Sequence, residues 1–458
     1  MTISLRNKFL FSSALLSLVL AGCGNGDTND SDSGDDVNDE SVTETDDNEA
    51  TEDSSNLSGE ITFWTASLSG DPFDGYFEEI KSDFEDMHPD VTVTIQDTPQ
   101  NEMEQRVLTS LTGSDAMDVV NLNPHYMANV ASQGGLLNME DYLDDDISSR
   151  FVEGAFEAGY YNDELFALPW YLTTTVSWYN GDHFEAAGIE DVPSSMQEVH
   201  EVSRAITEET GNPSFFQIIN DGNTIMEKMV TIADGDNIVE NGEAVFHNNE
   251  DILEFFETIQ EMYSEGLISQ QNAEGSIGAA QELFMNENLS LVEGGITFLG
   301  PIESGAPSVY EASQAGQPLD GEDAPMNIAV MNLAVPANTE NPEAAVAFAE
   351  FVLNAENQLE FAKLAGTVLP STVESLEDDY FTDPGDSPKA TGIQQGAQAL
   401  ERARVLIPLT GNNFDLREMT RNKFVEVMIG DVSADEGLNQ LADEWTQSFS
   451  NSDIDVSF

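Results

Sequence analysis

The sequence predicts an α/β protein in which helices cover the faces of mostly parallel sheets. From residue 59 onward, stretches with the apolar spacing of strands alternate with stretches of helical spacing, which is typical of such sheets. The 458 residues exceed one ordinary domain, so we expect two or three domains, each able to bury its own core. Near the middle, a β-branched run between aromatics and turn residues indicates a further strand, a turn and a short helix.

The first folded stretch shows the alternation most clearly. We predict strands over Gly59–Trp64, Val91–Ile95 and Asp118–Leu122, with helices over Phe73–Phe84 and Met103–Leu111 between them. Ligands of such sheets bind in crevices beyond the carboxyl ends of strands. The residues after the first strand and those after the third strand are therefore expected near a ligand.

The central segment, residues 165–188, is the most informative part of the chain. Thr173–Val176 is a β-branched run that favours an extended strand, and the helix after the following turn ends at Gly188. Trp170 and Tyr171 lie just before this strand, where a rigid aromatic pair could offer a flat face to a ligand. Packing in the core is the alternative role, because aromatics dominate cores as well as binding sites.

The second half continues the mixed pattern. We predict helices over residues 196–206, 252–263, 279–284, 344–353, 397–405, 416–429 and 434–449, and strands over 289–292 and 327–335. Residues 306–326 are rich in Gly, Pro and Ser, which indicates a long surface loop. Gly294 and Gly295 permit close backbone approach, which suits a ligand site and an ordinary turn equally.

The N-terminus predicts export and lipid attachment. Residues 1–22 carry a basic start and a short apolar run, as a signal peptide does. Residues 20–23, LAGC, resemble the lipobox of bacterial lipoproteins, which implies cleavage before Cys23 and a lipid on that cysteine. Residues 23–58 are acidic and polar with no means of forming a core, so we expect a tether that holds the folded part clear of the membrane.

The charge balance excludes some partners. The 14 Lys and Arg residues face 87 Asp and Glu residues, which gives a formal net charge of −73. Such a field repels nucleic acid and anionic lipid surfaces, so we expect no nucleic-acid function. A heavily acidic, hydrated surface is also what a protein from a salt-rich environment needs, and we expect a halophilic source.

Catalytic and metal-binding motifs are absent from the sequence. The five histidines are scattered, Cys23 is the single cysteine, and no phosphate loop or nucleophile motif occurs. A carboxylate pair for glycoside hydrolysis is uninformative in so acidic a chain. We therefore expect a protein that is not an enzyme and that uses no cofactor or metal.

Six segments follow one another along the chain: ITFW, DVVNLNPHYMANVASQGGLLNMEDYL, ALPWYLTTTVSWYNGDHFEAAGI, ELFMNENLSLVEGG, NPEAAVAFAEFVLNAENQLEFAKLAGTVLPST and KFVEVMIGDVSADEGLNQLADEW. In this order they resemble the bacterial extracellular solute-binding proteins of ABC importers, in the sugar-binding group related to maltose-binding protein. The resemblance implies the periplasmic-binding-protein-like type II fold, with two α/β lobes joined by a hinge of several segments near 173–176, near 331–334 and after Pro370.

The resemblance also implies lobe boundaries and ligand contacts. Lobe 1 would comprise residues 59–172 and 335–370, and lobe 2 residues 173–334 and 371–458. Sugar would stack on aromatics and bond polar side chains. By position, the contacts would be Trp64, Ser67, Asn123, Tyr126, Trp170, Tyr171, Thr173, Thr297, Phe298 and Arg417. On this basis Trp170→Ala would weaken sugar binding by more than about 1 kcal/mol with the fold intact.

The expected function is capture of a carbohydrate between two lobes, and its delivery to the transmembrane subunits of an ABC permease, by a lipid-anchored monomer on the cell surface. A charged small solute, such as a glycerol phosphate or a polyamine, is the alternative ligand, and Arg417 would suit an anion. A secreted glycoside-processing enzyme is the alternative class.

Overall fold

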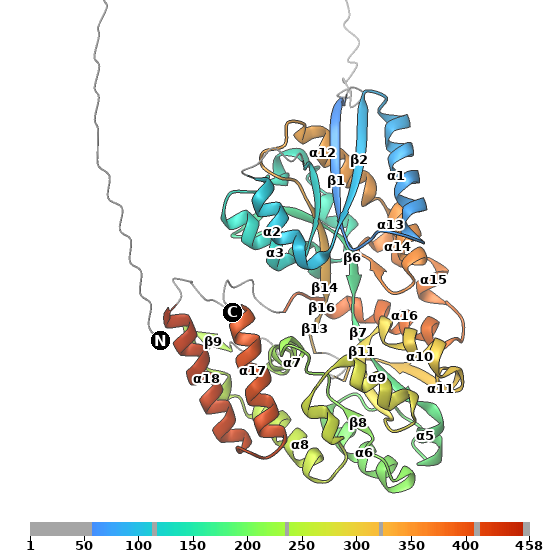
Figure 1. Cartoon of the computed structure of the whole chain (residues 1–458), viewed down its shortest axis with the longest axis vertical. Helices are drawn as coiled ribbons and strands as arrows, with labels where there is room; N and C mark the ends of the chain where they lie inside the picture. The colour runs from blue at the N-terminus through green and yellow to red at the C-terminus, as the bar shows by residue number, and fades with distance from the viewer. Residues whose placement is uncertain (1–56, 112–116, 234–237, 320–323, 407–412, 452–458) are drawn as a thin grey trace, which may run out of the picture. The chain divides into compact units, whose positions relative to one another are not determined.

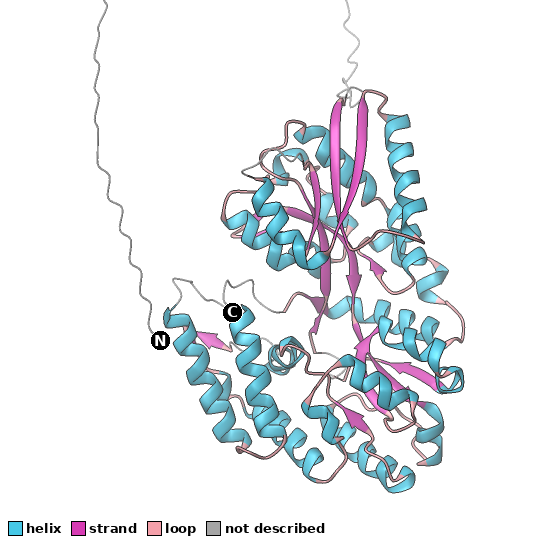
Figure 2. Ribbon diagram, in the orientation of Figure 1, coloured by secondary structure: helices cyan, strands magenta, loops and turns pink. Residues whose placement is uncertain are grey.

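A computed structural model of the chain describes residues 57–111, 117–233, 238–319, 324–406 and 413–451 (Figure 1). The predicted signal peptide, Cys23 and the predicted tether up to residue 56 lie outside these residues. The described residues form two main sheets with helices on their faces, which confirms the α/β class (Figure 2). We call the two parts of the fold built on these sheets lobe 1 and lobe 2.

The sheet of lobe 1 has six strands in the order β15-β6-β14-β3-β1-β2. These strands are β1 (Gly59–Ala66), β2 (Val91–Thr98), β3 (Val119–Leu122), β6 (Ala167–Thr173), β14 (Ala329–Ala334) and β15 (Leu369–Pro370). The three strands nearest the N-terminus are parallel, as expected, but β14 runs antiparallel to β3, and β6 runs antiparallel to β14. The sheet is therefore mixed, because β14, which follows the strands of lobe 2 in the sequence, lies antiparallel between β6 and β3.

Helices cover both faces of the lobe 1 sheet. They are α1 (Phe73–Met87), α2 (Gln100–Ser110), α3 (Pro124–Ser132), α4 (Glu153–Glu157), α12 (Pro342–Val352) and α13 (Ala355–Ala365). Alternation along β1 divides the core, since Phe63 packs on the side of α1 and α12 while Trp64 packs on the side of α2 and α3. The helix predicted over Phe73–Phe84 is confirmed as α1, and its apolar face buries Phe77, Ile80 and Phe84.

The sheet of lobe 2 has four strands in the order β12-β7-β11-β8. These strands are β7 (Thr175–Asn180), β8 (Phe215–Phe216), β11 (Leu291–Gly295) and β12 (Ser313–Gly316). The helices of this lobe are α5 (Gly181–Ala186), α6 (Met196–Thr210), α7 (Asn223–Ala233), α8 (Glu250–Ser264), α9 (Ile277–Met285), α10 (Gly300–Gly305), α11 (Pro307–Ala312), α16 (Pro388–Ala399), α17 (Asn413–Met428) and α18 (Ala434–Asn451).

Short elements complete the described fold. The helices are α14 (Val373–Leu376), α15 (Asp379–Thr382) and the 3₁₀ turns η1 (Met139–Tyr142), η2 (Ile147–Arg150), η3 (Phe246–Asn248), η4 (Gln270–Ala273), η5 (Ile296–Leu299) and η6 (Leu400–Arg402). The strand pairs are β4 (Tyr160–Tyr161) with β5 (Glu164–Leu165), β9 (Val239–Glu240) with β10 (Glu243–Ala244), and β13 (Met326–Asn327) with β16 (Ala403–Arg404). No helix among the described residues is both long and apolar enough to cross a bilayer.

The chain passes between the lobes where the sequence analysis expects its first crossing. Strand β6 ends at Thr173 in the first sheet, and β7 begins at Thr175 in the second sheet. The crossing predicted near 331–334 is placed slightly too late, because Ala329–Ala334 form β14 and pair within the first sheet. Residues 329–334, assigned from sequence to lobe 2, therefore lie in lobe 1. The third crossing follows β15, after which α16 packs against β7 and β12.

Two other sequence predictions are corrected by pairing between distant segments. The predicted loop over 306–326 contains α11 and β12, and β12 pairs with β7 at the edge of the second sheet. The helix predicted over 397–405 ends instead at Ala399, because Ala403 and Arg404 form β16 beside β13. In both places a strand partner far away in the sequence decides the local structure.

Candidate ligand-binding site

The carboxyl ends of β1 and β2 meet at one edge of lobe 1 and hold Ser67 there. Ser67 is exposed and has a left-handed backbone (φ 56°). Its N–H donates to the carbonyl of Thr98 at 2.9 Å, and its Oγ accepts from the N–H of Gln100 at 2.9 Å. Asp97 tightens the same junction by accepting from the N–H of Leu68 at 2.7 Å. Ser67 thus lies at the strand edge predicted to face a ligand.

Asn123 and Tyr126 lie together after β3, but they contact each other. The Oδ1 of Asn123 accepts from the N–H of Tyr126 at 2.9 Å and caps α3. The ring of Tyr126 is partly buried against the core on the α2 and α3 side of the sheet. The local role of Asn123 is therefore to start a helix, which leaves its predicted ligand contact as a prediction.

Three of the predicted stacking aromatics are core residues. Trp170 and Phe298 have no exposed surface, and Trp64 is 2% exposed beneath the guanidinium of Arg106, 4.6 Å from its ring centroid. Strand alternation turns both tryptophans onto covered faces of the lobe 1 sheet. A side chain without exposed surface offers no face to a sugar, so the sequence-based assignment of these three residues is corrected.

Three further predicted site residues, Tyr171, Thr173 and Thr297, are partly or fully exposed. Tyr171 packs partly buried against Phe361, with ring centroids 5.2 Å apart. Burial, and then the negative charge of Asp97, raise the pKa of the Tyr171 phenol, so its hydroxyl stays protonated as a hydrogen-bond donor. Thr173 is partly buried at the end of β6, and Thr297 is exposed in η5. All three keep surface with which a ligand could make contact.

A cavity of about 140 Å³ lies in lobe 2 beyond the carboxyl end of β11, and we call it the Lys228–Glu293 pocket. Its lining residues are Thr175, Gln217, Ile218, Asn220, Thr224, Glu227, Lys228, Thr231, Ile277, Glu293, Gly294, Gly295, Met326 and Asn327. Gly294 and Gly295, for which the sequence allowed either a ligand site or an ordinary turn, are among these lining residues. The polar members come from α7 and from the loop after β8, which the sequence analysis did not single out.

Buried charged groups form part of the wall of this pocket. Lys228 Nζ lies 2.7 Å from Glu293 Oε2, and the two side chains are 9% and 7% exposed. Glu293 Oε1 also accepts from the N–H of Leu319 at 2.8 Å. Glu227 accepts from the Nδ2 of Asn327 at 2.7 Å. Ionic groups withdrawn from water persist only with such partners, so this is a constructed polar site.

Gln217 contributes an unfilled acceptor to the same pocket. The residue is 3% exposed, and its side-chain Nε2 donates to the carbonyl of Ile218 at 3.1 Å. Its backbone N–H donates to Asn272 Oδ1 at 2.8 Å, which fixes its position. Its Oε1 is buried and has no hydrogen-bond partner among the described residues. Buried acceptors are nearly always paired, so this oxygen indicates a place for an external donor.

Arg417 lies at the start of α17, beside the loop that borders the pocket. Its Nη1 is 3.1 Å from Asp221 Oδ2, while its buried Nε has no partner among the described residues. The next turn of α17 contacts the same loop, since Arg421 Nε donates to the carbonyl of Asn220 at 2.9 Å. The positive charge of Arg417 also acts on His125 of lobe 1. Arg417 is thus placed near residues of both lobes, with its charge largely neutralised by Asp221.

His125 makes this region sensitive to pH. Burial, and then the charge of Arg417, lower the pKa of His125 from 6.5 to about 4. The stabilisation from neutral His125 is therefore present above pH 6.5 and lost as the pH falls from 6.5 toward 4. We expect the difference in unfolding free energy between wild type and His125→Gln to decrease over this range. Denaturation of both proteins at several pH values measures it, and a constant difference would contradict the expectation.

Phe414 is a residue that the sequence analysis missed. It is 73% exposed, the highest exposure of any large apolar side chain in the described part of the chain. It precedes Arg417 by about one helical turn, at the start of α17. A signal was present in the sequence, because Phe414 stands between polar residues at the beginning of a helix, where a core-facing residue is not expected.

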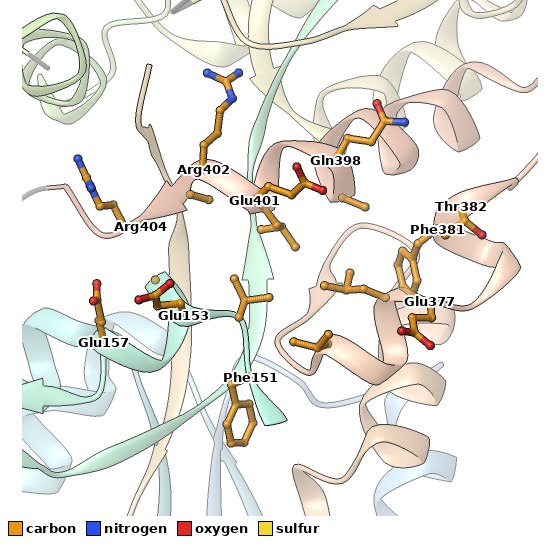
Figure 3. A pocket seen from close by; sticks show the side chains of 17 residues that line it. Phe151, Glu153, Glu157, Glu377, Phe381, Thr382, Gln398, Glu401, Arg402 and Arg404 are labelled. Carbon is orange, nitrogen blue, oxygen red and sulfur yellow. The ribbon is translucent and has the colours of Figure 1, made fainter. Parts of the chain in front are cut away.

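A larger cavity of about 720 Å³ lies elsewhere, between α4, the α14–α15 stretch and the stretch that ends in β16 (Figure 3). Buried Phe151, Phe381 and Leu400 line it, and its charged residues are exposed or partly exposed. None of its buried side-chain polar atoms in the described chain lacks a partner. It contains none of the predicted site residues, so we take the smaller pocket with its unfilled acceptor as the ligand site.

One group of side chains in the described residues has the donor set of a metal site. His200, Glu261 and Glu265 place ligand atoms within 4.8 Å of one another. Arg204 already forms two contacts of 2.7 Å with the carboxylate of Glu265, and these hydrogen bonds lower the pKa of Glu265 to about 2. The guanidinium therefore occupies the place in which a metal ion would neutralise this carboxylate.

Comparison with known proteins identifies the family. Residues 67–359 match the family described as bacterial extracellular solute-binding protein. An oligosaccharide-assigned periplasmic-binding protein of Synechococcus sp. MITs9220 has a TM-score of 0.73 and 28% identity, covering 85% of this chain and 99% of its own. The arabinooligosaccharide-binding protein of Bacillus subtilis (strain 168) is 24% identical over 252 residues, 53% of this chain and 51% of that protein.

Another curated relative is matched over a shorter stretch. A protein of Brucella abortus (strain 2308), named only as a binding protein, is 26% identical over 124 residues. The match spans 27% of this chain and about 30% of the length of that relative. The family match, in contrast, extends over more than half of the chain and includes β7, α7 and β11, which surround the Lys228–Glu293 pocket. The chain belongs to the bacterial extracellular solute-binding protein family.

Proposed function

We propose that the protein captures a carbohydrate at the Lys228–Glu293 pocket and presents it to a membrane permease of the ABC importer class. The observation that supports this most directly is the pocket itself, which is polar, close to the chain crossings and equipped with an unfilled acceptor at Gln217. Sugars present many hydroxyl groups, each of which can donate to such an acceptor. The two relatives named for oligosaccharides support the same ligand class.

In this proposal, the receptor is held at the outer face of the cytoplasmic membrane, where the permease lies. The basic start, the apolar run and the LAGC sequence before Cys23 support export and lipid attachment. A lipid-anchored receptor captures its ligand near the permease and makes or breaks no bond in it. Ligand contacts from both lobes would then favour a closed arrangement by population shift.

An anionic solute is the second candidate, and one observation favours it. The Nε of Arg417 is a buried donor without a partner among the described residues, and guanidinium groups suit carboxylates and phosphates. Asp221 at 3.1 Å already neutralises much of that charge. The Nε–H of Arg417 can therefore donate to a neutral hydroxyl oxygen as well as to an anion, and a carbohydrate fits the site better than an anionic solute does.

A thermal-shift screen tests the proposal. The chain from residue 59 onward is measured in high salt against neutral oligosaccharides, sugar phosphates and polyamines. A specific ligand raises the unfolding midpoint with its concentration by mass action, and we expect a saturable shift from one class of neutral sugar. A shift from sugar phosphates or polyamines alone would replace the carbohydrate by a charged solute. Release of reducing ends during the same incubation would indicate an enzyme.

Phe414 provides a direct test of the binding surface. We expect Phe414→Ala to weaken sugar affinity by about 1 kcal/mol, through lost stacking on an apolar sugar face, and to leave the unfolding midpoint unchanged because the ring is exposed. Calorimetric titration measures the affinity. Tyr142→Ala is the matched control, since Tyr142 is also an exposed aromatic but belongs to η1 and not to α17, which contacts the loop that borders the pocket. Equal losses in both variants would remove Phe414 from the site.

A further inference from the structure

The Lys228–Glu293 pocket has the size of one ring. Its volume is about 140 Å³, and cavities of about 150 Å³ hold a single six-membered ring such as benzene. Gln217, Lys228, Thr231 and Glu293 are each at most 8% exposed, whereas Ile277 at the rim is 37% exposed. The pocket is therefore closed by polar groups on its inner side, and a longer ligand must leave it through the rim.

The charges in the pocket oppose an anionic ligand. Glu227 and Glu293 carry two negative charges against one positive charge on Lys228, which leaves a net charge of −1. The ammonium of Lys228 is already paired with Glu293 at 2.7 Å. A carboxylate entering this space would lose its hydration and meet a net negative charge, which is unfavourable on both counts.

The hydrogen-bonding groups that line the pocket favour a ligand that carries a hydrogen-bond donor. The side-chain Nε2 of Gln217 donates to the carbonyl of Ile218 at 3.1 Å, which orients the amide, and Oε1 of the same amide has no hydrogen-bond partner among the described residues. Both oxygens of Glu293 have contacts already, with Lys228 and with the N–H of Leu319. A hydroxyl of a neutral ring supplies the donor that Gln217 lacks, whereas a deprotonated carboxylate has acceptors only.

From these three observations, and resting on the proposed carbohydrate function, we propose that the pocket binds one terminal, uncharged sugar ring. A ring hydroxyl donates to Gln217 Oε1, and sugars that end in a uronate are rejected. The pocket thus selects the ligand by its end group, and further sugar units extend past the rim. Glu227 sets the charge that rejects the uronate, and Gln217 sets the affinity for the neutral ring.

The test is calorimetric titration of the full chain with a neutral oligosaccharide and with the same oligosaccharide ending in a uronate. Salt of about 1 M shortens the Debye length to about 3 Å and removes the long-range field of the exposed carboxylates. We expect the uronate-ended sugar to bind at least tenfold more weakly. Gln217→Met should weaken the neutral sugar about fivefold, the effect of one neutral hydrogen bond.

Charge selection has its own matched pair of variants. Glu227→Gln keeps the shape of the side chain but removes its charge. It should reduce the ratio of affinities for the neutral and the uronate-ended sugar severalfold. Glu282→Gln removes one exposed carboxylate from α9 outside the pocket and should leave the ratio of affinities for the two sugars unchanged. The unfolding midpoint of each free variant shows that it is folded, and the Glu227 comparison stands even where Gln217→Met does not fold.

The outcomes separate this inference from the function on which it rests. Equal affinity for the neutral and the uronate-ended sugar, or an unchanged affinity in folded Gln217→Met, would overturn the end-group selection while sugar binding stands. Binding of no sugar of either kind would overturn the carbohydrate function itself. If Glu282→Gln reduced the ratio of affinities for the two sugars as much as Glu227→Gln does, the preference for the neutral sugar would come from the overall negative charge of the protein and not from the pocket.

Discussion

Trp170→Ala is expected to lower the free energy of unfolding by about 3–5 kcal/mol, the usual cost of removing a fully buried tryptophan. The indole has no exposed surface and contacts Phe361 with ring centroids 4.7 Å apart and Phe63 at 5.8 Å. Truncation leaves a cavity between α1, α13 and the lobe 1 sheet that these rings cannot fill. Chemical denaturation followed by circular dichroism measures the loss.

Two comparisons make this result decisive. Trp170→Phe keeps most of the ring volume and should cost much less than the alanine variant. Phe414→Ala should show the reverse behaviour, with unchanged stability and weakened sugar affinity. A Trp170→Ala protein as stable as wild type, yet weakened in sugar binding, would restore the ligand role expected from sequence.

Lys228→Met is expected to destabilise the protein by about 3–5 kcal/mol, because it leaves a buried carboxylate without its counter-charge. Glu293 is 7% exposed, and its Oε2 loses the partner at 2.7 Å. The N–H of Leu319, which donates to Glu293 Oε1 at 2.8 Å, is a neutral donor and does not replace the charge of Lys228. The free energy of unfolding from urea denaturation gives the cost.

A double variant and a surface pair serve as controls. Lys228→Met combined with Glu293→Gln should be more stable than Lys228→Met alone, since the neutral amide can still accept from Leu319. Arg150→Met removes an ion pair of 3.1 Å whose side chains are 45% and 27% exposed, and it should cost less than about 1 kcal/mol. A similarly small cost for Lys228→Met would show that Glu293 is not held as a buried charge.

Local features of the sequence were sufficient for much of the fold. The apolar face of α1, the proline in the first turn of α12 and the β-branched run at the first crossing follow from spacing and backbone restrictions. These signals act within a few residues, so no distant partner is needed to interpret them. Family membership also follows from the order of segments along the chain, and the comparison with known proteins confirms it.

The candidate binding site was harder to predict from the sequence, and two aromatic residues show why. Trp170 and Phe414 are both large and apolar, and composition alone favours either of them as a stacking surface. Strand alternation and the helices on each face bury Trp170, while Phe414 remains exposed at the start of a helix. Burial depends on which elements cover a residue, and that information is absent from its immediate neighbours in the chain.

The sequence by itself determined the α/β class, the family, the negative net charge and the segment in which the chain first crosses between the sheets, because each depends on composition or short-range pattern. Only the tertiary structure decided that β14 returns to the first sheet and that Gln217, Lys228 and Glu293 line one pocket. These residues come from a loop, a helix and a strand that are far apart in sequence. Their shared chemistry exists only after packing has brought them together and excluded water around them.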